Sequence, residues 1–288
     1  MIFLIFSIIC SVTVGVLFKF AKRYEINIMQ TVTWNYLFAI CLSIFFFKPD
    51  FTSITIQSIS PIYIALGILL PVIFIFQGLA VTNAGLAKTD IAQRLSLFIS
   101  LAAAYFLFND YFDRLKYVGL IFGLIAIVLT LYRRGSSSST KNSWIYLIFV
   151  FVGFGVIDVL FKFVSQITTI PYTTSLFLIF CISFILSICY ILYLALNKKT
   201  KLQLVNFVCG CILGLFNFGN ILFYLKAHRA MADNPSTVFA AMNIGVIIVG
   251  SLIGIIAFKE RLSRYNYVGL LFALIAIVLI TLSKLHAI

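Results

Sequence analysis

Charged and polar side chains recur inside long apolar stretches of this sequence, where each needs a partner or a route to water. Asp158 and Lys162 stand four residues apart and would share one face of a helix. A charge at the centre of a lipid bilayer costs about 2.5–3.5 kcal/mol on insertion scales. The pair is therefore either a self-neutralising ion pair or the site of a functional carboxylate. In the second case Asp158 takes up a proton or binds a polar ligand, and both interpretations stay open.

A denser polar group lies between residues 88 and 100. Asp90 and Arg94 are again four residues apart and can form a pair. Lipid offers no hydrogen bonds, so a polar helix face must meet a wet cavity or the polar groups of a neighbouring helix, and we favour the cavity. The side chains with helical spacing along this face are Thr89, Gln93, Ser96 and Ser100.

Further polar residues complete the set of candidates. Asn217, Asn220 and Tyr224 have the spacing of one helix face and could bind a polar solute or a neighbouring helix. Lys19 lies near the end of an apolar stretch, and we favour the interpretation that its side chain extends to the membrane–water interface. The candidate solute-binding residues are Lys19, Gln77, Asp90, Gln93, Arg94, Asp158, Lys162, Asn217, Asn220, Tyr224 and Asn243, with Asp158 as the candidate for proton coupling.

The motifs of nucleotide, metal and nucleophile chemistry are missing from the sequence. It contains no phosphate-binding glycine loop, dinucleotide fingerprint, His-x-x-x-His pair or Gly-x-Ser-x-Gly elbow. Its six cysteines include no Cys-x-x-Cys pair and lie within apolar stretches, where they serve as small packing residues. We therefore expect no catalytic residues, no enzyme activity, no cofactor and no metal.

The elements that must position these residues are membrane-spanning helices. Of 288 residues 63% are hydrophobic and 10% are charged, whereas about 25% of a soluble domain is charged. The apolar stretches are long enough to cross a hydrocarbon core of about 30 Å and are apolar on all sides, unlike the alternating strands of a barrel. Ten spans are expected, at roughly 2–21, 29–47, 61–81, 85–108, 115–132, 144–164, 172–196, 204–226, 234–257 and 265–284.

The positive net charge is explained by contact with the lipid headgroups of a membrane. The net charge is +13, and most Lys and Arg residues stand at the ends of spans, beside anionic headgroups. We expect membrane lipids as partners and no nucleic acid. The loops after the odd-numbered spans are richer in Lys and Arg, which would place both termini outside the cell.

The two halves of the sequence repeat one another. Residues 117–129 and 267–279 are identical at eleven of thirteen positions, at an offset of 150. Leu17-Phe18-Lys19-Phe20 recurs as Leu160-Phe161-Lys162-Phe163. Five spans per copy would make the second copy enter the membrane from the opposite side, as in transporters with a solute site near the midplane. The predicted organisation is one five-helix repeat over 1–132, a polar Ser-rich linker over 133–143 and a second repeat over 144–288.

This pattern resembles the EamA-type branch of the drug/metabolite transporter superfamily. The resemblance covers essentially the whole chain and includes Lys259-Glu260-Arg261-Leu262-Ser263 followed by Val268-Gly269, whereas Asn109-Asp110-Tyr111-Phe112 departs from the pattern in the first half. It implies an all-α protein that moves small metabolites, with export favoured, either coupled to protons or driven by the solute gradient. It also implies cytoplasmic termini, against the charge count, so the orientation stays open.

The sequence thus predicts a secondary transporter of the inner (plasma) membrane. Its expected ligand is a small organic metabolite such as an amino acid, moved by alternating access without a required oligomer. A non-transporting membrane scaffold and a membrane-embedded enzyme are the alternatives. With only two His residues and short loops, the chain gives each of them little support.

Overall fold

The computed structural model of the chain describes residues 2–24, 26–55, 59–108, 114–131, 143–197, 200–231, 235–260 and 262–286. Within these ranges the ordered elements are helices, and no strand occurs. The helices are α1 (Ile2–Arg23), α2 (Ile28–Phe47), the short 3-10 helix η1 (Phe51–Ser53), α3 (Pro61–Ala84), α4 (Leu86–Leu95), α5 (Leu97–Phe108), α6 (Arg114–Leu131), α7 (Ser143–Gln166), α8 (Tyr172–Leu196), α9 (Leu204–Ala230), α10 (Pro235–Ile256) and α11 (Arg264–His286).

The helix ends follow the apolar stretches to within a few residues, with one exception. The single helix predicted over 85–108 is wrong, because the structure divides it into α4 and α5 at Ser96. The Ser96 hydroxyl donates a hydrogen bond to the carbonyl oxygen of Gln93, and such local bonds compete with the regular helix ladder. The predicted linker over 133–143 lies outside the described residues except for its last residue, Ser143.

In the described part of the chain, seven helices are long and apolar enough to cross a membrane, namely α1, α2, α3, α7, α8, α9 and α11. Shorter apolar segments lie at Tyr117–Ala126 in α6 and Ala241–Ile256 in α10. Large apolar side chains such as Phe45, Phe106 and Leu196 are exposed, as expected where lipid replaces water. These features indicate a membrane protein.

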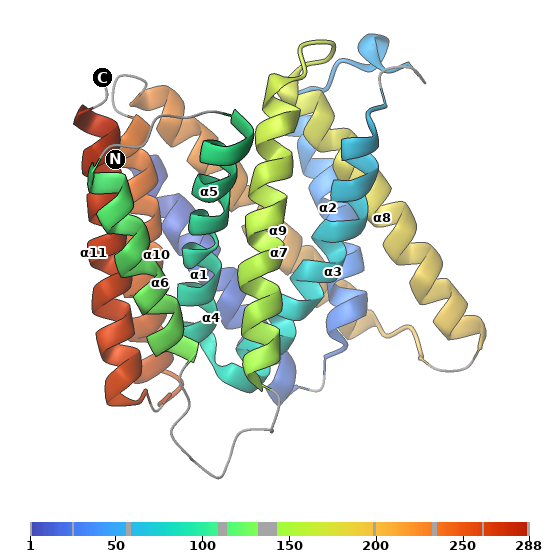
Figure 1. The fold of residues 1–288 in the computed structure, drawn as a ribbon. Helices are drawn as coiled ribbons and strands as arrows, with labels where there is room; N and C mark the ends of the chain where they lie inside the picture. The colour runs from blue at the N-terminus through green and yellow to red at the C-terminus, as the bar shows by residue number, and fades with distance from the viewer. Residues whose placement is uncertain are drawn as a thin grey trace.

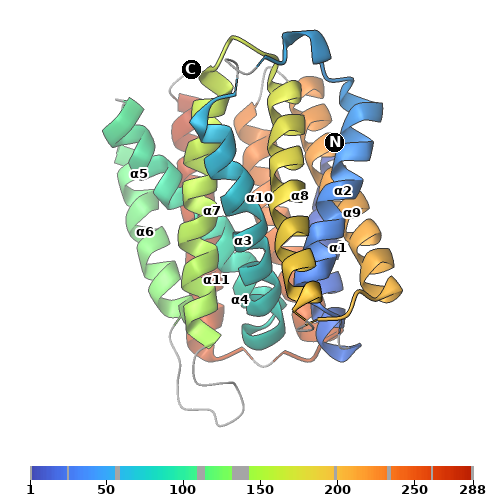
Figure 2. The ribbon, with the colours of Figure 1, turned by 90° about the vertical axis from the view of Figure 1, so that its right-hand side faces the viewer.

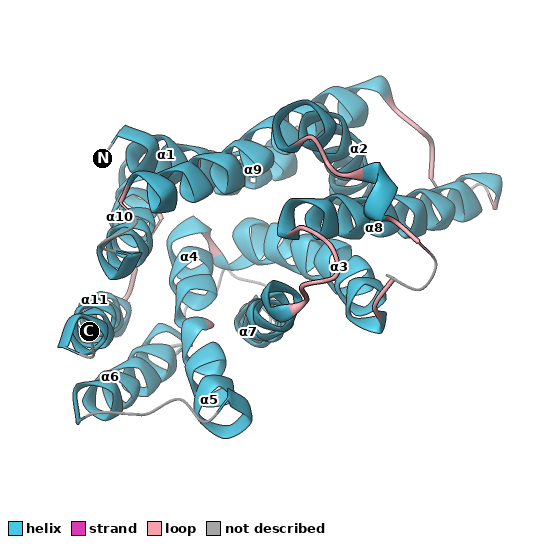
Figure 3. Ribbon diagram, turned by 90° about the horizontal axis from the view of Figure 1, so that it is seen from above, coloured by secondary structure: helices cyan, strands magenta, loops and turns pink. Residues whose placement is uncertain are grey.

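The helices stand side by side in one upright bundle (Figures 1 and 2). Helices from the two halves of the sequence pack on one another. Helix α6 lies along α11, α2 contacts α8 and α9, and α3 contacts α7 and α8. Viewed end-on, α4 lies inside the ring of other helices (Figure 3). Its Leu86 belongs to one buried apolar cluster, and its Ile91 and Leu95 belong to another. The polar helix α4 is thus fixed in the interior by apolar packing at both ends.

Candidate functional site

Arg94 is the residue on which most of the polar side chains converge. Its Nη2 donates a hydrogen bond of 2.8 Å to Ser11 Oγ in α1. Asp158 in α7 and Tyr224 in α9 are near enough to interact with its charge. Its Nε is buried and has no hydrogen-bond partner among the described residues. Four helices therefore meet at one guanidinium group that still has a donor to offer.

Asp158 faces this cluster from α7. Ser100 Oγ in α5 donates to Asp158 Oδ2 at 3.4 Å, and Tyr172, the first residue of α8, interacts with the same carboxylate. The Asp158 side chain is nevertheless exposed. Lys162 lies one turn further along α7. The carboxylate is thus shared among α4, α5 and α8, so an ion pair with Lys162 alone does not describe its surroundings.

Asp90 is separated from water. Its side chain is only 4% exposed, and Oδ2 has no hydrogen-bond partner among the described residues. Gly250 in α10 lies directly against this oxygen, and a β-carbon at that position would collide with it. Asp90 lies near enough to Arg94 for an ionised carboxylate to attract it, but the hydrogen bond of Arg94 Nη2 goes to Ser11. The predicted pairing of Asp90 with Arg94 is therefore a proximity without a direct hydrogen bond.

The candidate amides divide between neighbouring helices. Gln77 Nε2 donates to Gln93 Oε1 at 2.8 Å and joins α3 to α4. Asn217 Nδ2 donates to Asn35 Oδ1 at 3.2 Å, which ties α9 to α2. Asn220 Oδ1 accepts from Ser7 Oγ at 2.8 Å, which ties α9 to α1. Asn217 and Asn220 therefore bond to different helices, while Tyr224 alone faces Arg94. Asn243 is buried in α10.

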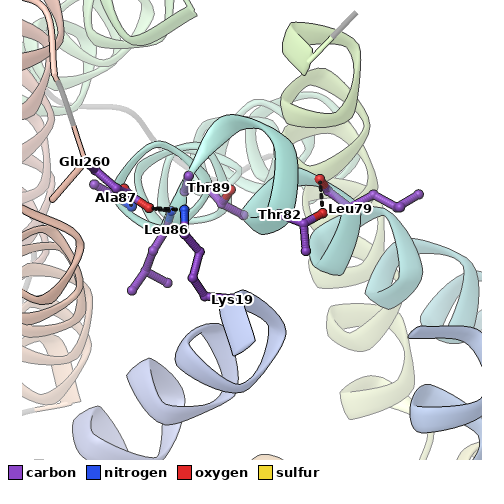
Figure 4. A network of polar contacts seen from close by, with 8 residues as sticks. Lys19, Leu79, Thr82, Leu86, Ala87, Thr89 and Glu260 are labelled. Carbon is purple, nitrogen blue, oxygen red and sulfur yellow. Dashed lines mark hydrogen bonds and ion pairs between the residues drawn. The ribbon is translucent and has the colours of Figure 1, made fainter. Parts of the chain in front are cut away.

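One end of α4 is held by Glu260, which lies in the loop between α10 and α11 (Figure 4). Glu260 Oε1 accepts a hydrogen bond of 2.7 Å from the amide of Leu86, and Oε2 accepts one of 3.1 Å from the amide of Ala87. Lys19 Nζ in α1 lies 2.7 Å from Oε1. A carboxylate at a helix N-terminus satisfies free amides and complements the helix dipole. The network thus ties together α1, α4 and the loop after α10.

Two glycines allow this approach. Gly85 has a φ of +105°, and a β-carbon there would lie 2.8 Å from Glu260 Oε2. A β-carbon at Gly254 would lie 2.9 Å from the same oxygen. Lys19 thus forms an ion pair with Glu260, whereas the interpretation favoured from the sequence is that its side chain extends to the membrane–water interface. The candidates predicted from the sequence do not include Glu260, Ser11 or Tyr172. Of these, Glu260 had a signal in the sequence, as the acidic residue between the two basic residues of Lys259-Glu260-Arg261.

The chain resembles known proteins in sequence and in fold. No protein-family model matches it. An uncharacterized protein of Haemophilus influenzae is 41% identical over 282 residues, which cover 95% of this chain and 95% of that protein. A protein of known crystal structure is 13% identical, with a TM-score of 0.62 over 99% of this chain and 97% of that chain. At 13% identity, the likeness to this crystal structure shows a shared fold and nothing more.

Proposed function

We propose that this chain, which belongs to the same family as the Haemophilus influenzae protein, is a secondary transporter of a small zwitterionic metabolite such as an amino acid. The observation that carries the proposal is the placement of Arg94 and Asp158 on different helices within one polar cluster. Charged side chains among the helices of a membrane protein are costly, so a functional role is the default hypothesis.

A zwitterion matches the two ends of this cluster. The guanidinium of Arg94 presents donors in a planar fork, which suits a carboxylate, and its buried Nε has no partner in the described part of the chain. The carboxylate of Asp158 suits an ammonium group, and its exposed side chain is open to a ligand. The hydroxyl groups of Tyr172 and Tyr224 stand beside the two charges and could bond the polar middle of such a solute.

An inverted repeat of ten helices is part of the proposal. The two copies of the repeated segment lie in α6 and α11, which pack along one another and run in opposite directions (Figure 1). Phe122 and Phe272, equivalent at the offset of 150, stack with ring centroids 5.2 Å apart. Contact between equivalent residues is what a two-fold axis between the copies produces. The arrangement supports membership of the EamA-type branch and transport by alternating access.

The contacts of Glu260 support the closure of one end. Glu260 joins α4 to α1 and to the loop after α10, whereas Asp158 on the other side of Arg94 is exposed. A tie at one end, with access to the site from the other, is what alternating access would require of a single state. Proton coupling belongs to the proposal, with Asp158 as the candidate from the sequence, as does residence in the inner membrane.

Exchange of radiolabelled amino acids in proteoliposomes tests the proposal. Wild-type protein should exchange at least one zwitterionic amino acid faster than protein-free liposomes do. Arg94→Gln and Asp158→Asn should each lower that exchange about tenfold or more, because hydrogen bonds to charged groups contribute about 1.5–3 kcal/mol. Asp50→Asn changes an exposed carboxylate in the loop after α2 and is the matched control.

Two results would contradict the proposal. One is that no zwitterion among the common amino acids exchanges above the rate in protein-free liposomes. The other is that Arg94→Gln and Asp158→Asn exchange a solute at the rate of Asp50→Asn. The second result would leave a transporter whose site lies elsewhere in the bundle.

A further inference from the structure

Asp90 is a buried carboxylate for which the proposed solute site has no use. It lies on α4, one turn from Arg94, but its side chain is 4% exposed and points against α10. An ionised carboxylate has about four lone-pair sites to satisfy, and Oδ2 satisfies none among the described residues. A buried charge with unmade hydrogen bonds costs several kcal/mol, and a bound proton removes that charge.

We propose that Asp90 is the proton-carrying residue of this transporter, and that its proton and the solute bind together. The inference rests on the proposed function, and it moves proton coupling from Asp158 to Asp90. In the arrangement described here Asp90 is protonated. It loses its proton to water when α10 separates from α4, leaving a carboxylate on Asp90 and a hydrated proton on the side that has opened.

The groups around Asp90 explain why the proton is held. Glu260 adds a second negative charge near it at the N-terminus of α4, and Lys19 from α1 is already bound to Glu260. From α10 the residue that lies against Asp90 is Gly250, which has no side chain to ionise. The remaining charge is Arg94, whose guanidinium is engaged with Ser11 and attracted by Asp158 in α7.

Arg94 provides the link between proton and solute. When Asp90 is ionised, its negative charge attracts Arg94 and repels a solute carboxylate that approaches the same guanidinium. When Asp90 is protonated, Arg94 is free of that competition. By reciprocity, a solute carboxylate on Arg94 must favour the proton on Asp90 by the same factor. Proton and solute then cross in the same direction, opposite to the export that the family resemblance favours.

The packing of α10 provides the gate for the proton. Gly250 has no side chain, so the α10 backbone closes directly over Asp90 Oδ2. The same helix leads into the loop of Glu260, whose amide donates to the carbonyl oxygen of Gly254 at 2.9 Å. Separation of Glu260 from α4 would therefore carry the end of α10 away with it. Opening of the tied end and hydration of Asp90 are thus one movement.

Transport driven by a pH gradient tests the coupling. Wild-type proteoliposomes with an acidic exterior should accumulate the solute, by up to about tenfold per pH unit for one proton per solute. Asp90→Asn mimics the protonated side chain, so it should keep solute exchange at the wild-type level and lose accumulation in the pH gradient. Asp158→Asn should lose both, and Asp50→Asn should lose neither.

Three transport results would overturn the inference. Asp90→Asn could retain accumulation driven by the pH gradient, or it could lose exchange as fully as Asp158→Asn does. Wild-type protein could also accumulate the solute only with an acidic interior. Failure of wild-type protein to exchange any solute would instead contradict the proposed function.

A spectroscopic measurement on purified protein tests the proton without transport. Infrared spectra at neutral pH should show the carbonyl band of a protonated carboxylic acid in the wild type. The band should persist in Asp50→Asn and Asp158→Asn and disappear in Asp90→Asn. A wild-type spectrum without the band, or a band that Asp90→Asn retains, would overturn the inference whatever the flux measurements show.

Discussion

Replacement of Glu260 by Gln removes the charge that ties α4 to α1 and to the loop after α10. The carboxylate accepts hydrogen bonds from the amides of Leu86 and Ala87 and lies 2.7 Å from Lys19 Nζ. The amide of Gln keeps one oxygen, so one backbone bond can survive. Its nitrogen cannot accept the other bond, and no ion pair with Lys19 remains.

The magnitude follows from these contacts. The Glu260 side chain is 9% exposed, so its charge-assisted bonds are little screened, and losing one of them with the charge costs about 2–3 kcal/mol. Lys19→Gln leaves both backbone bonds in place. The ion pair that it removes involves a lysine that is 22% exposed, so solvent screening limits the cost to about 1 kcal/mol.

Thermal unfolding of the purified protein in detergent measures both changes. At about 2 °C per kcal/mol for a chain of this size, Glu260→Gln should lower Tm by about 4–6 °C and Lys19→Gln by about 2 °C. Lys259→Gln is the control, because Lys259 is exposed and adjoins Glu260 in the chain. A Tm of Glu260→Gln equal to that of Lys259→Gln would refute the reasoning, as would a larger loss in Lys19→Gln than in Glu260→Gln.

Three other substitutions test other contacts. Gly85→Ala should lower Tm through about 1–3 kcal/mol of backbone strain, in addition to the close contact with Glu260 Oε2. Gly219→Ala lies within a helix and brings its β-carbon to 3.2 Å from Cys10 Sγ, so it should lower Tm less; equal Tm values would contradict the role of the positive φ. Asn206→Leu should cost about 2–3 kcal/mol in the same assay, because it leaves the buried amide oxygen of Gln30 without its 2.8 Å donor; an unchanged Tm would show that water replaces it. Arg94→Lys keeps the charge without the planar fork and should lower amino-acid exchange about tenfold, and exchange at the wild-type rate would argue against a bound carboxylate.

The apolar stretches predicted the helices well, because the cost of exposing backbone groups to lipid makes each long stretch helical. They did not reveal the break at Ser96, where a local hydrogen bond to Gln93 competes with the ladder. They also did not reveal which helices are neighbours. The packing of α6 on α11 joins residues about 150 positions apart and depends on the shape of the whole bundle.

The sequence identified polar residues within single helices but not their partners on other helices. Asp90 and Arg94 could be identified from the polarity of α4 alone. The binding of Lys19 by Glu260 joins residues 241 positions apart and requires a positive φ at Gly85. The spacing of Asn217 and Asn220 suggested one shared face, but the two amides reach different neighbours because α1 and α2 flank α9.

We propose that the cluster around Arg94 opens to one membrane face at a time. Ser100 donates to Asp158 there, so Ser100→Cys in a variant without native cysteines places a reactive thiol beside the cluster. On this proposal, an impermeant thiol reagent should label this position faster from one face, and the transported solute should slow the labelling. Adding Glu260→Gln should raise the rate of labelling from the opposite face. Equal rates from both faces, unchanged by the solute and by Glu260→Gln, would contradict it.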